Sequence, residues 1–154
     1  MTIPIRQSNI RDANIRDLEP LAQLFDSYRQ FYEQPSDFVL AKTFLTERFN
    51  KQESVILVVE SVEKKLIGFC QIYPSFCSVD AEKIGVLYDL FVDTSARKTG
   101  AGRELMLAAH EYAAHNSMAR LDLSTAKNNI AAQSLYESLG WVRDEVFYTY
   151  NKTF

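Results

Sequence analysis

Several residue types that carry common protein functions are scarce in this chain of 154 residues. It has two cysteines, two histidines, five glycines and four prolines. Cys70 and Cys77 lie seven positions apart in a strand-like region, so they would point to opposite faces of a regular strand. We expect both to be reduced, without a disulfide or catalytic role. His110 and His115 would lie about 140° apart around a helix, which excludes a shared metal ion, and no zinc site is expected.

The chain also lacks an excess of positive charge and a long apolar run. Its formal net charge is −3, and the cations are scattered except around residues 97–103. A general nucleic-acid binder needs clustered lysine and arginine, so we expect no nucleic-acid partner. No apolar stretch approaches the ~20 residues of a membrane helix, and the first residues do not have the pattern of a signal peptide. We therefore expect no membrane partner and a cytoplasmic location.

The length and the hydrophobic content of 47% predict a single domain over residues 1–154. Apolar spacing predicts a short strand at 2–6, a helix beginning near Asp17, and a second helix from about Asp37 to Phe49. The remaining predicted strands are Ser54–Glu60, Leu66–Tyr73, Lys83–Val92, 120–124, Trp141–Val142 and Glu145–Asn151, with one helix after the glycines near 100 and another from about 128 to Gly140. The order β-α-α-β-β-β-α-β-α-β-β predicts a mixed α/β fold of the α+β type, with a mainly antiparallel sheet flanked by helices.

One stretch combines a strand, a glycine loop and a helix. The segment Val86–Val92 has the composition of a strand, and Arg103–Ala109 has helical spacing. Residues 97–103 between them (Arg-Lys-Thr-Gly-Ala-Gly-Arg) contain two glycines and three cations. The N–H groups of a helix start and the helix dipole attract anions, so this loop is a candidate phosphate site.

Two other phosphate-binding motifs are excluded by their spacing. A dinucleotide fingerprint beginning at Gly100 requires a small residue where Leu105 stands. A Walker loop requires a glycine at the same position followed by lysine, where Met106 stands. The remaining motif, Arg-x-x-Gly-x-Gly between a strand and a helix, is by itself also compatible with an ordinary turn.

A second motif, considered with the first, points to a family. Arg97–Gly102 matches (Gln/Arg)-x-x-Gly-x-(Gly/Ala) after a fourth strand, and Asn129–Trp141 matches an Asn followed two helical turns later by Leu-Tyr and then by Gly and an aromatic residue. In these two signatures and in the order of its predicted elements, the chain resembles the GCN5-related N-acetyltransferase (GNAT) family over almost its whole length.

The resemblance implies acetyl-CoA as the acetyl donor, bound where the fourth and fifth strands splay apart. It assigns the pantetheine arm to the backbone of the fourth strand and the pyrophosphate to the glycine loop. The residues assigned to cofactor binding are Leu90, Phe91, Val92, Arg97, Lys98, Thr99, Gly100, Ala101, Gly102, Arg103 and Asn129. A main-chain donor near Phe91 or Val92 would stabilise the oxyanion.

Two residues are candidates for the proton transfers. The resemblance suggests Tyr136 as the general acid that protonates the leaving thiolate, although a helical tyrosine can also simply pack. Some family members place a base where this chain has Ser124, so Asp89 in the central strand is our candidate base, acting directly or through water. Strict alternation puts Asp89 on one face with Leu87 and Phe91. Its alternative role is that of a structural carboxylate hydrogen-bonded in the sheet.

The family usually selects substrates with its first helical hairpin and last strands. Here the segment Tyr28–Asp37 alternates tyrosines with acids, so Glu33 and Asp37 are candidates to receive an ammonium group on which Tyr28 or Tyr32 stacks. The alternative is a helix end with one buried and one solvated face. This hairpin and the Leu-Tyr-Asp-Leu-Phe-Val strand also look like the branch containing fungal histone, polyamine and D-amino-acid acetyltransferases.

These observations predict an N-acetyltransferase that moves acetyl from acetyl-CoA to a primary amine of a small molecule, such as a polyamine or an amino acid, by direct attack in a ternary complex. One alternative is acetylation of protein lysines or N-termini. Another is a non-enzymatic acyl-CoA-binding sensor, which would not need Tyr136. A homodimer is expected because relatives often form one.

Overall fold

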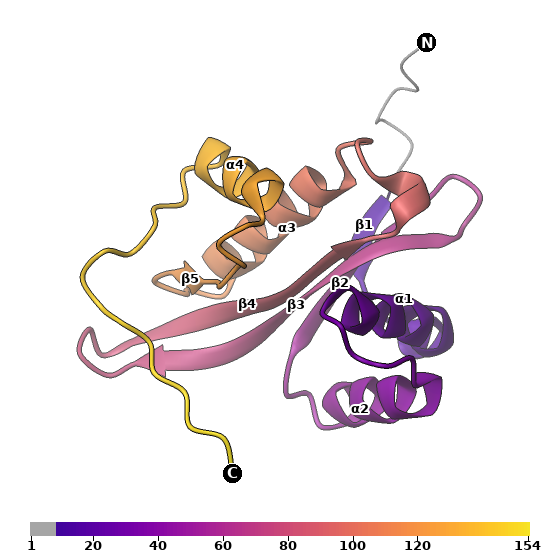
Figure 1. Cartoon of the computed structure of the whole chain (residues 1–154), viewed down its shortest axis with the longest axis horizontal. Helices are drawn as coiled ribbons and strands as arrows, with labels where there is room; N and C mark the ends of the chain where they lie inside the picture. The colour runs from indigo at the N-terminus through magenta and orange to yellow at the C-terminus, as the bar shows by residue number, and fades with distance from the viewer. Residues whose placement is uncertain (1–8) are drawn as a thin grey trace. The chain divides into compact units, whose positions relative to one another are not determined.

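The computed structural model describes residues 9–154, which form two compact units, one ending at Leu123 and one spanning Ser124–Phe154 (Figure 1). The strand predicted over residues 2–6 lies outside the described residues. The first unit contains all the strands of the described residues and three of the α-helices, and the second contains one α-helix.

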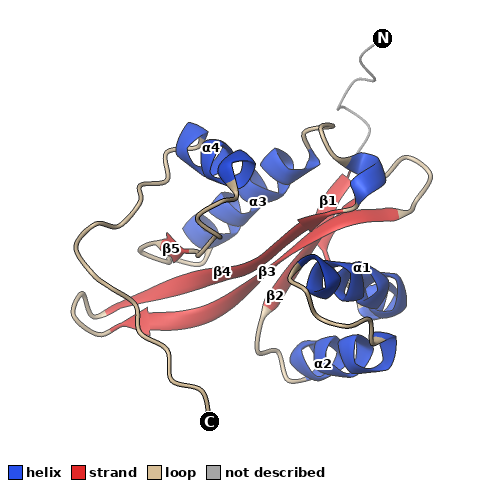
Figure 2. Ribbon diagram, viewed as in Figure 1, coloured by secondary structure: helices blue, strands red, loops and turns tan. Residues whose placement is uncertain are grey.

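A five-stranded sheet forms the centre of the first unit (Figure 2). Its order is β1-β2-β3-β4-β5, and the bounds are β1 Asn9–Asp12, β2 Val55–Glu60, β3 Leu66–Cys77, β4 Glu82–Val92 and β5 Leu121–Asp122. The pairs from β1 to β4 are antiparallel, and β5 is parallel to β4. The prediction of a mixed, mainly antiparallel sheet is therefore confirmed, and β1 is a strand that the sequence pattern missed.

Two helices, α1 (Leu18–Phe31) and α2 (Phe38–Asn50), cover one face of this sheet, and α3 (Ala101–His115) covers the other (Figure 1). Short 3₁₀ turns at Ile15–Asp17 and Thr94–Ala96 precede α1 and the glycine loop. The α1 and α2 bounds agree with the predicted helices to within a residue or two. Asp37 is the N-cap of α2, because its Oδ1 accepts the N–H of Leu40 at 3.0 Å.

The hydrophobic core under α1 and α2 explains why the hairpin lies on this face. The stripe of α1 that begins with Leu21 and Phe25 packs on Ala41 and Leu45 of α2. The sheet contributes alternate residues to the same core, which are Ile56, Val58, Leu66, Phe69 and Phe91. Spacing at three and four residues in a helix and at two in a strand brings these side chains to one surface.

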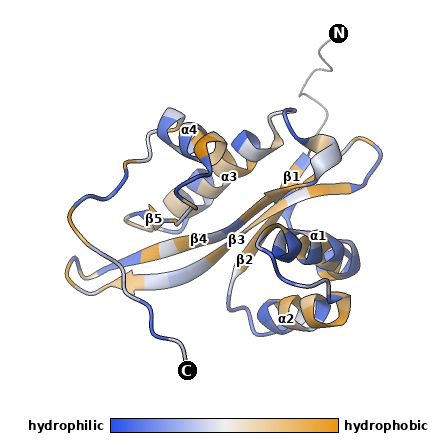
Figure 3. Cartoon of the chain, viewed as in Figure 1, coloured by the Kyte–Doolittle hydropathy of each residue, from blue (hydrophilic) through white to orange (hydrophobic). Residues whose placement is uncertain are grey.

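The second unit contains α4 (Ile130–Ser138), which begins after the N-cap Asn129 and is followed by Gly140 at φ 89°. Residues 141–154 contain no strand, so the predictions of strands at Trp141–Val142 and Glu145–Asn151 were wrong (Figure 2). Phe147 and Tyr148 of this segment are exposed, and its ribbon carries both hydrophobic and hydrophilic colours (Figure 3). Branched and aromatic residues favour a strand only when a neighbouring strand pairs with them, and composition does not supply that neighbour.

Candidate active site

A bulge in β4 determines which side chains face α1. Gln71 of β3 lies opposite Asp89, but the next residue, Ile72, lies opposite Leu87, so Tyr88 has no partner on β3. Consecutive residues of a strand point to opposite faces, and therefore Asp89 and Leu87 do as well. The expectation that Asp89 and Leu87 share a face was wrong, because strict alternation does not allow for an inserted residue. The bulge places Asp89 with Phe91 on the face that α1 covers.

Asp89 is a buried carboxylate, 4% exposed. Its Oδ2 accepts a hydrogen bond of 2.7 Å from Nε2 of Gln71, and the hydroxyl of Tyr28 is a second donor. No ion pair among the described residues involves Asp89. Burial raises the pKa of Asp89 above the ordinary range of a carboxyl, and the two hydrogen bonds offset part of that rise. A buried acid with a raised pKa and no cationic partner is a candidate functional group.

Tyr28 joins α1 to this acid. Its ring contacts Phe69 and Phe91 edge-on, with centroid distances of 5.9 and 6.0 Å. Its hydroxyl lies between two acceptors, the Asp89 carboxylate and the backbone carbonyl of Tyr88, the latter at 3.4 Å. Burial and the nearby negative charge of Asp89 raise the pKa of Tyr28, so the phenol remains protonated and acts as a donor.

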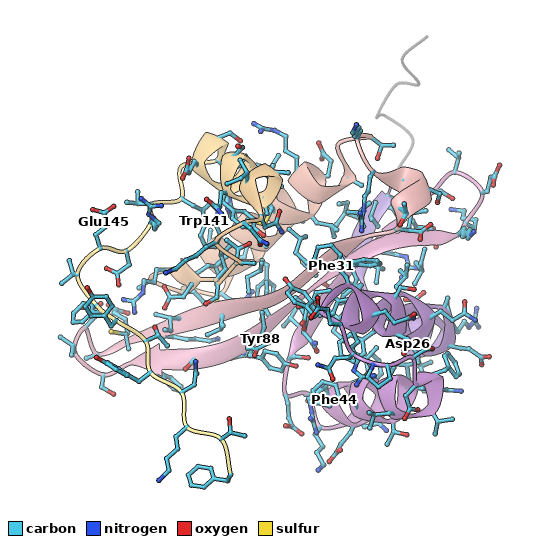
Figure 4. The ribbon with its side chains drawn as sticks, in the orientation of Figure 1. Asp26, Phe31, Phe44, Tyr88, Trp141 and Glu145 are labelled. Atoms are coloured by element: carbon cyan, nitrogen blue, oxygen red, sulfur yellow. The ribbon has the colours of Figure 1, made fainter. Side chains whose placement is uncertain are left out.

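Two tyrosines that the sequence did not single out lie beside Asp89. Tyr88, the bulged residue, is 68% exposed and contacts Tyr73 edge-on at 5.9 Å. Tyr88 lies on the α1 side of the sheet, and Phe31 lies at the end of α1 (Figure 4). Burial and the charge of Asp89 raise the pKa of Tyr73 to about 12. The only sequence signal for this group is the density of aromatic residues in β3 and β4.

The other predicted substrate residues lie at the end of α1. Tyr32 contacts Tyr28 edge-on at 5.1 Å, so these two predicted residues are brought together. Glu33 is exposed and has a left-handed backbone, with φ 62°. Asp37 uses one carboxylate oxygen to cap α2, which leaves the other for a ligand. The role of Glu33 and Asp37 toward an ammonium group stays a prediction.

Asp26, which sequence reasoning missed, fixes the hairpin that carries these residues. It is buried between α1 and α2 (Figure 4) and accepts hydrogen bonds from the Ser36 hydroxyl at 2.6 Å and the Asp37 N–H at 2.8 Å. These donors hold the pKa of Asp26 below its ordinary value. Asp26 therefore ties the loop after Tyr32 to α1 and keeps the end of the helix in place.

The predicted cofactor residues of β4 lie along an open strand edge. β5 pairs with β4 only at Gly85 and Val86, so within the described residues no strand covers the same edge from Leu90 to Val92. Gly85 permits the close approach of β5, since a Cβ there would lie 2.7 Å from Cδ2 of Leu121. Backbone groups of such an edge can pair with an extended ligand, as the assignment to the pantetheine arm requires.

The glycine loop has the backbone of a helix-start anion site. Gly100 precedes α3 with φ 90°, a left-handed conformation in which a side chain is strained. Lys98 is also left-handed, with φ 62°. The first intrahelical bond of α3 runs from Glu104 N to Gly100 O, so the N–H groups of Ala101 and Gly102 lie before the first intrahelical acceptor, as in other helix-start anion sites. This fits the pyrophosphate of the expected cofactor.

Two side chains of the loop secure its shape. The Thr99 hydroxyl donates to the Ala96 carbonyl at 2.5 Å. Arg97 donates from Nε to the Val92 carbonyl at 3.3 Å, and its guanidinium lies 5.7 Å from the ring centre of Phe91 and 5.8 Å from that of Phe31. Arg97 therefore links the loop to the end of β4 and to the end of α1, where Tyr32 follows Phe31.

The remaining predicted residues, Asn129 and Tyr136, lie in the second unit. Oδ1 of Asn129 accepts the N–H of Ala132 at 3.2 Å, so its Nδ2 group is what could reach a ligand. The ring of Tyr136 contacts Trp141 at 6.2 Å, and the carbonyl of Tyr136 accepts the Trp141 N–H at 3.1 Å. Trp141 is thus a packing partner for the Tyr136 ring, as the alternative role of Tyr136 requires. The role of Tyr136 as a general acid stays a prediction.

The described residues contain no group of three or more histidine, cysteine or acidic side chains that would hold a metal ion. Cys70 and Cys77 are free cysteines, and burial raises the pKa of Cys70 to about 12. Over the same residues, every helix is too short or too polar to cross a bilayer.

Comparisons with known proteins agree with this geometry. Residues 18–141 match the family model described as the acetyltransferase (GNAT) family. The chain is 45% identical over 142 residues to the uncharacterized N-acetyltransferase YhfO of Bacillus subtilis strain 168, covering 92% of this chain and 95% of that protein. It is 30% identical over 125 residues to a probable acetyltransferase of Haemophilus influenzae, with 81% and 84% covered.

A solved structure gives the same result for the fold. The crystal structure of a probable acetyltransferase superposes with a TM-score of 0.89 at 35% identity and covers 95% of this chain and 97% of the other. The two sequence signatures and the sheet with its open β4 edge are thus explained together. The chain belongs to the GNAT family and is an acetyl-CoA-dependent N-acetyltransferase.

Proposed function

We propose that the acceptor is a small molecule with a primary amine that arrives as an ammonium cation, and that Asp89 is the base that takes its proton. The observation that carries this proposal is the environment of Asp89, a carboxylate 4% exposed with two hydrogen-bond donors and no ion-pair partner in the described part of the chain. A buried negative charge usually has a cation beside it. A cationic substrate would supply that charge.

The aromatic side chains beside Asp89 support the same substrate class. Tyr28 and Tyr73 both interact with the acid, Tyr88 contacts Tyr73 edge-on, and Tyr32 contacts Tyr28 at the end of α1. Aromatic faces attract ammonium groups without offering a competing ion pair. This combination suits a compact polyamine or amino acid better than a neutral acceptor.

The proposed proton transfers balance. Asp89 removes a proton from the ammonium group, directly or through a water molecule, which frees the nitrogen lone pair to form the C–N bond. Bound acetyl-CoA supplies an acetyl thioester whose C–S bond breaks. Tyr136 would then donate a proton to the departing sulfur, because the pKa of a phenol, about 10, is close to that of a thiol. The nitrogen loses its second proton as the C–S bond breaks, and that proton replaces, through solvent, the one that Tyr136 gave to the sulfur. The proton on Asp89 is released to solvent, so each acetyl transfer releases one proton overall.

The cofactor residues would act through their backbone. The N–H groups of residues 101–103 and the charges of Arg97 and Lys98 would hold the pyrophosphate, and the open edge Leu90–Val92 would hold the pantetheine arm. Nδ2 of Asn129 would donate to an oxygen of the cofactor. Charge and main-chain donors suffice for this task, so the affinity should fall as salt screens the charges.

A comparison of acceptors tests the proposed function. CoA thiol release is measured with polyamines, amino acids, aminoglycosides and lysine peptides, using the wild-type enzyme and Asp89→Asn. We expect turnover with one or more of the small amines, lost by a factor of about 10² or more in Asp89→Asn. Turnover confined to the peptides would contradict the small-molecule acceptor. Full activity of Asp89→Asn would contradict the base.

A further inference from the structure

A chain of hydrogen bonds runs from Ser54, the residue before β2, through Gln71 of β3 to Asp89 of β4. Gln71 of β3 lies opposite both Ile56 of β2 and Asp89 of β4, so its side chain stands between those strands on the α1 face. Ser54 lies two residues before Ile56 and belongs to the same row of side chains. The Ser54 hydroxyl donates to Oε1 of Gln71 at 2.6 Å, and Nε2 of Gln71 donates to Oδ2 of Asp89 at 2.7 Å.

The two ends of this chain agree on its direction. A serine hydroxyl can donate or accept, whereas an ionised carboxylate only accepts, so the amide presents its N–H₂ to Asp89 and its oxygen to the Ser54 hydroxyl, which donates to it. An ionised carboxylate only accepts hydrogen bonds, so this orientation favours the charged form of Asp89 over the protonated form. A rotated amide would present its oxygen to Asp89 and would favour the protonated form instead.

Burying the polar side chain of Gln71 costs free energy unless its amide makes both hydrogen bonds. Gln71 is 0% exposed, in a part of the sheet where the neighbouring core positions are Val58, Phe69 and Phe91. An apolar residue of similar size would fill that space without the requirement for two partners. Ser54 is only half-buried, and its hydroxyl bond to Gln71 is therefore the accessible end of the chain.

We infer that Gln71, oriented by Ser54, is a positioning residue that holds the carboxylate of Asp89 ionised and fixed in rotation, with Oδ1 left to accept the proton of the substrate. This inference rests on the proposed function, in which Asp89 is the base. The other titratable groups that interact with Asp89 are Tyr28 of α1 and Tyr73 and Cys70 of β3, none of which is a cation. Gln71 is therefore the principal neutral donor on the sheet side of the acid.

The test uses Gln71→Met, which keeps the length of the side chain and removes both of its hydrogen bonds. The pKa of Asp89 is measured by ¹³C NMR of carboxyl-labelled free enzyme, and the acid limb of kcat/KM is measured in parallel. We expect both to move upward by about one pH unit, so that kcat/KM falls about tenfold on the acid side and recovers at high pH. The KM for acetyl-CoA should not change.

Three further variants separate positioning from mere packing. Ser54→Ala should shift both measurements in the same direction by a smaller amount, because the amide loses its orienting donor. Ser54→Thr keeps the hydroxyl and should restore wild-type values. Ser75→Ala, which removes a hydroxyl four residues further along β3 from Gln71, is the matched control and should leave both unchanged. If Gln71→Met does not fold, the same two measurements on Ser54→Ala and Ser54→Thr test the inference.

The NMR titration of Asp89 and the pH profile of kcat/KM together distinguish a failure of the positioning role from a failure of the proposed function. An unshifted NMR titration of Asp89 in Gln71→Met, or in Ser54→Ala where Gln71→Met does not fold, overturns the positioning role, whatever the activity. A shifted titration with an unchanged pH profile means that Asp89 is not the base, which overturns the proposed function and the positioning role with it. A parallel shift of both measurements, reversed by Ser54→Thr, supports the inference.

Discussion

The hydroxyl of Tyr28 on α1 lies 3.4 Å from the backbone carbonyl of Tyr88, the bulged residue of β4. A bulge leaves backbone groups without their usual partner on the neighbouring strand, and here a side chain from the covering helix serves one of them. Because the same hydroxyl also lowers the pKa of Asp89, the helix acts on this acid at the point where the strand departs from regular pairing. Five predictions follow from this arrangement and its surroundings.

Removing the Tyr28 hydroxyl should lower the ionised fraction of Asp89 on the acid side without loosening the fold. Tyr28→Phe keeps the ring contacts to Phe69 and Phe91 but removes a donor to Asp89. We expect the pKa of Asp89 to rise and the acid limb of kcat/KM to move upward by roughly one pH unit. A pH-rate profile measures this, and Tyr112→Phe on α3 is the control. An unmoved acid limb would contradict the contact between the hydroxyl and the carboxylate.

Asp89→Asn should lose activity and gain stability. The folded-state pKa of Asp89 is raised, so its contribution to stability is full below the unfolded pKa of about 3.9 and is lost as pH rises through the folded value. Asparagine does not ionise, and we expect the difference in Tm between variant and wild type to grow in favour of the variant from pH 4 to pH 8. Thermal melting at several pH values measures it. A difference that shrinks over this range would refute the raised pKa.

Substitution of Gly100 should impair the binding of acetyl-CoA. Gly100→Ala places a side chain at φ 90° and in the space for the pyrophosphate. Gly140→Ala is a matched control, with φ 89° and no atom within 4 Å of the added Cβ. Both should lose about 1 kcal/mol of stability, and only the first should lose affinity in calorimetric titration with acetyl-CoA. Equal affinities would mean that the loop is an ordinary turn.

Tyr136→Phe should lower kcat by a factor of about 10² while the KM for acetyl-CoA stays nearly constant. The substitution removes the proton donor and keeps the ring that contacts Trp141. Tyr148→Phe, at an exposed tyrosine of the same unit, should leave kcat unchanged. Steady-state kinetics decides between the two roles of Tyr136, since a residue that only packs would give a normal kcat in the phenylalanine variant.

Asp26 should stabilise the hairpin in a pH-dependent way. Its pKa is lowered by the Ser36 hydroxyl and the Asp37 N–H, so its contribution is present above the unfolded pKa of about 3.9 and is lost as pH falls through the lower folded value. Asp26→Asn should cost roughly 1–3 kcal/mol at pH 7, and less in acid. Denaturant unfolding at both pH values measures this. Ser36→Ala removes one of the two donors and should cost less.

The sequence predicted the helices well because each has a local signal. Asp37 is an N-cap residue and so indicates the start of α2. Pro20 lies in the first turn of α1, where it does not interrupt the apolar stripe of that helix. The strands were less predictable, because pairing depends on residues distant in sequence. Nothing near Tyr88 marks the bulge, so alternation assigned Asp89 and Leu87 to one face. For the same reason, the composition of residues 145–151 predicted a strand that has no neighbour.

The candidate site residues also divide into those with a local sequence signal and those that only the strand pairing reveals. Motifs with fixed spacing predicted roles for the glycine loop, Asn129 and Tyr136, and the chemistry of a charge within an apolar strand made Asp89 a candidate. Gln71 and Ser54 carry no such signal, because a glutamine or a serine in a strand is ordinary on a solvated face. Only the strand register shows that Gln71 is buried opposite an acid.

The bulge at Tyr88 divides β4 into two halves that can vary independently. Before it, Leu87 packs with Ile72 toward the α3 layer, and after it, Asp89 and Phe91 face α1. A mutation that lengthens or shortens the β3–β4 hairpin changes the pairing between the bulge and the hairpin turn, which is the outer half of β4. In the inner half, from Asp89 to Val92, the side chains that face α1 are set by the pairing with Gly68 to Gln71. Such a strand allows the length of the outer hairpin to change while the face that carries Asp89 stays in register.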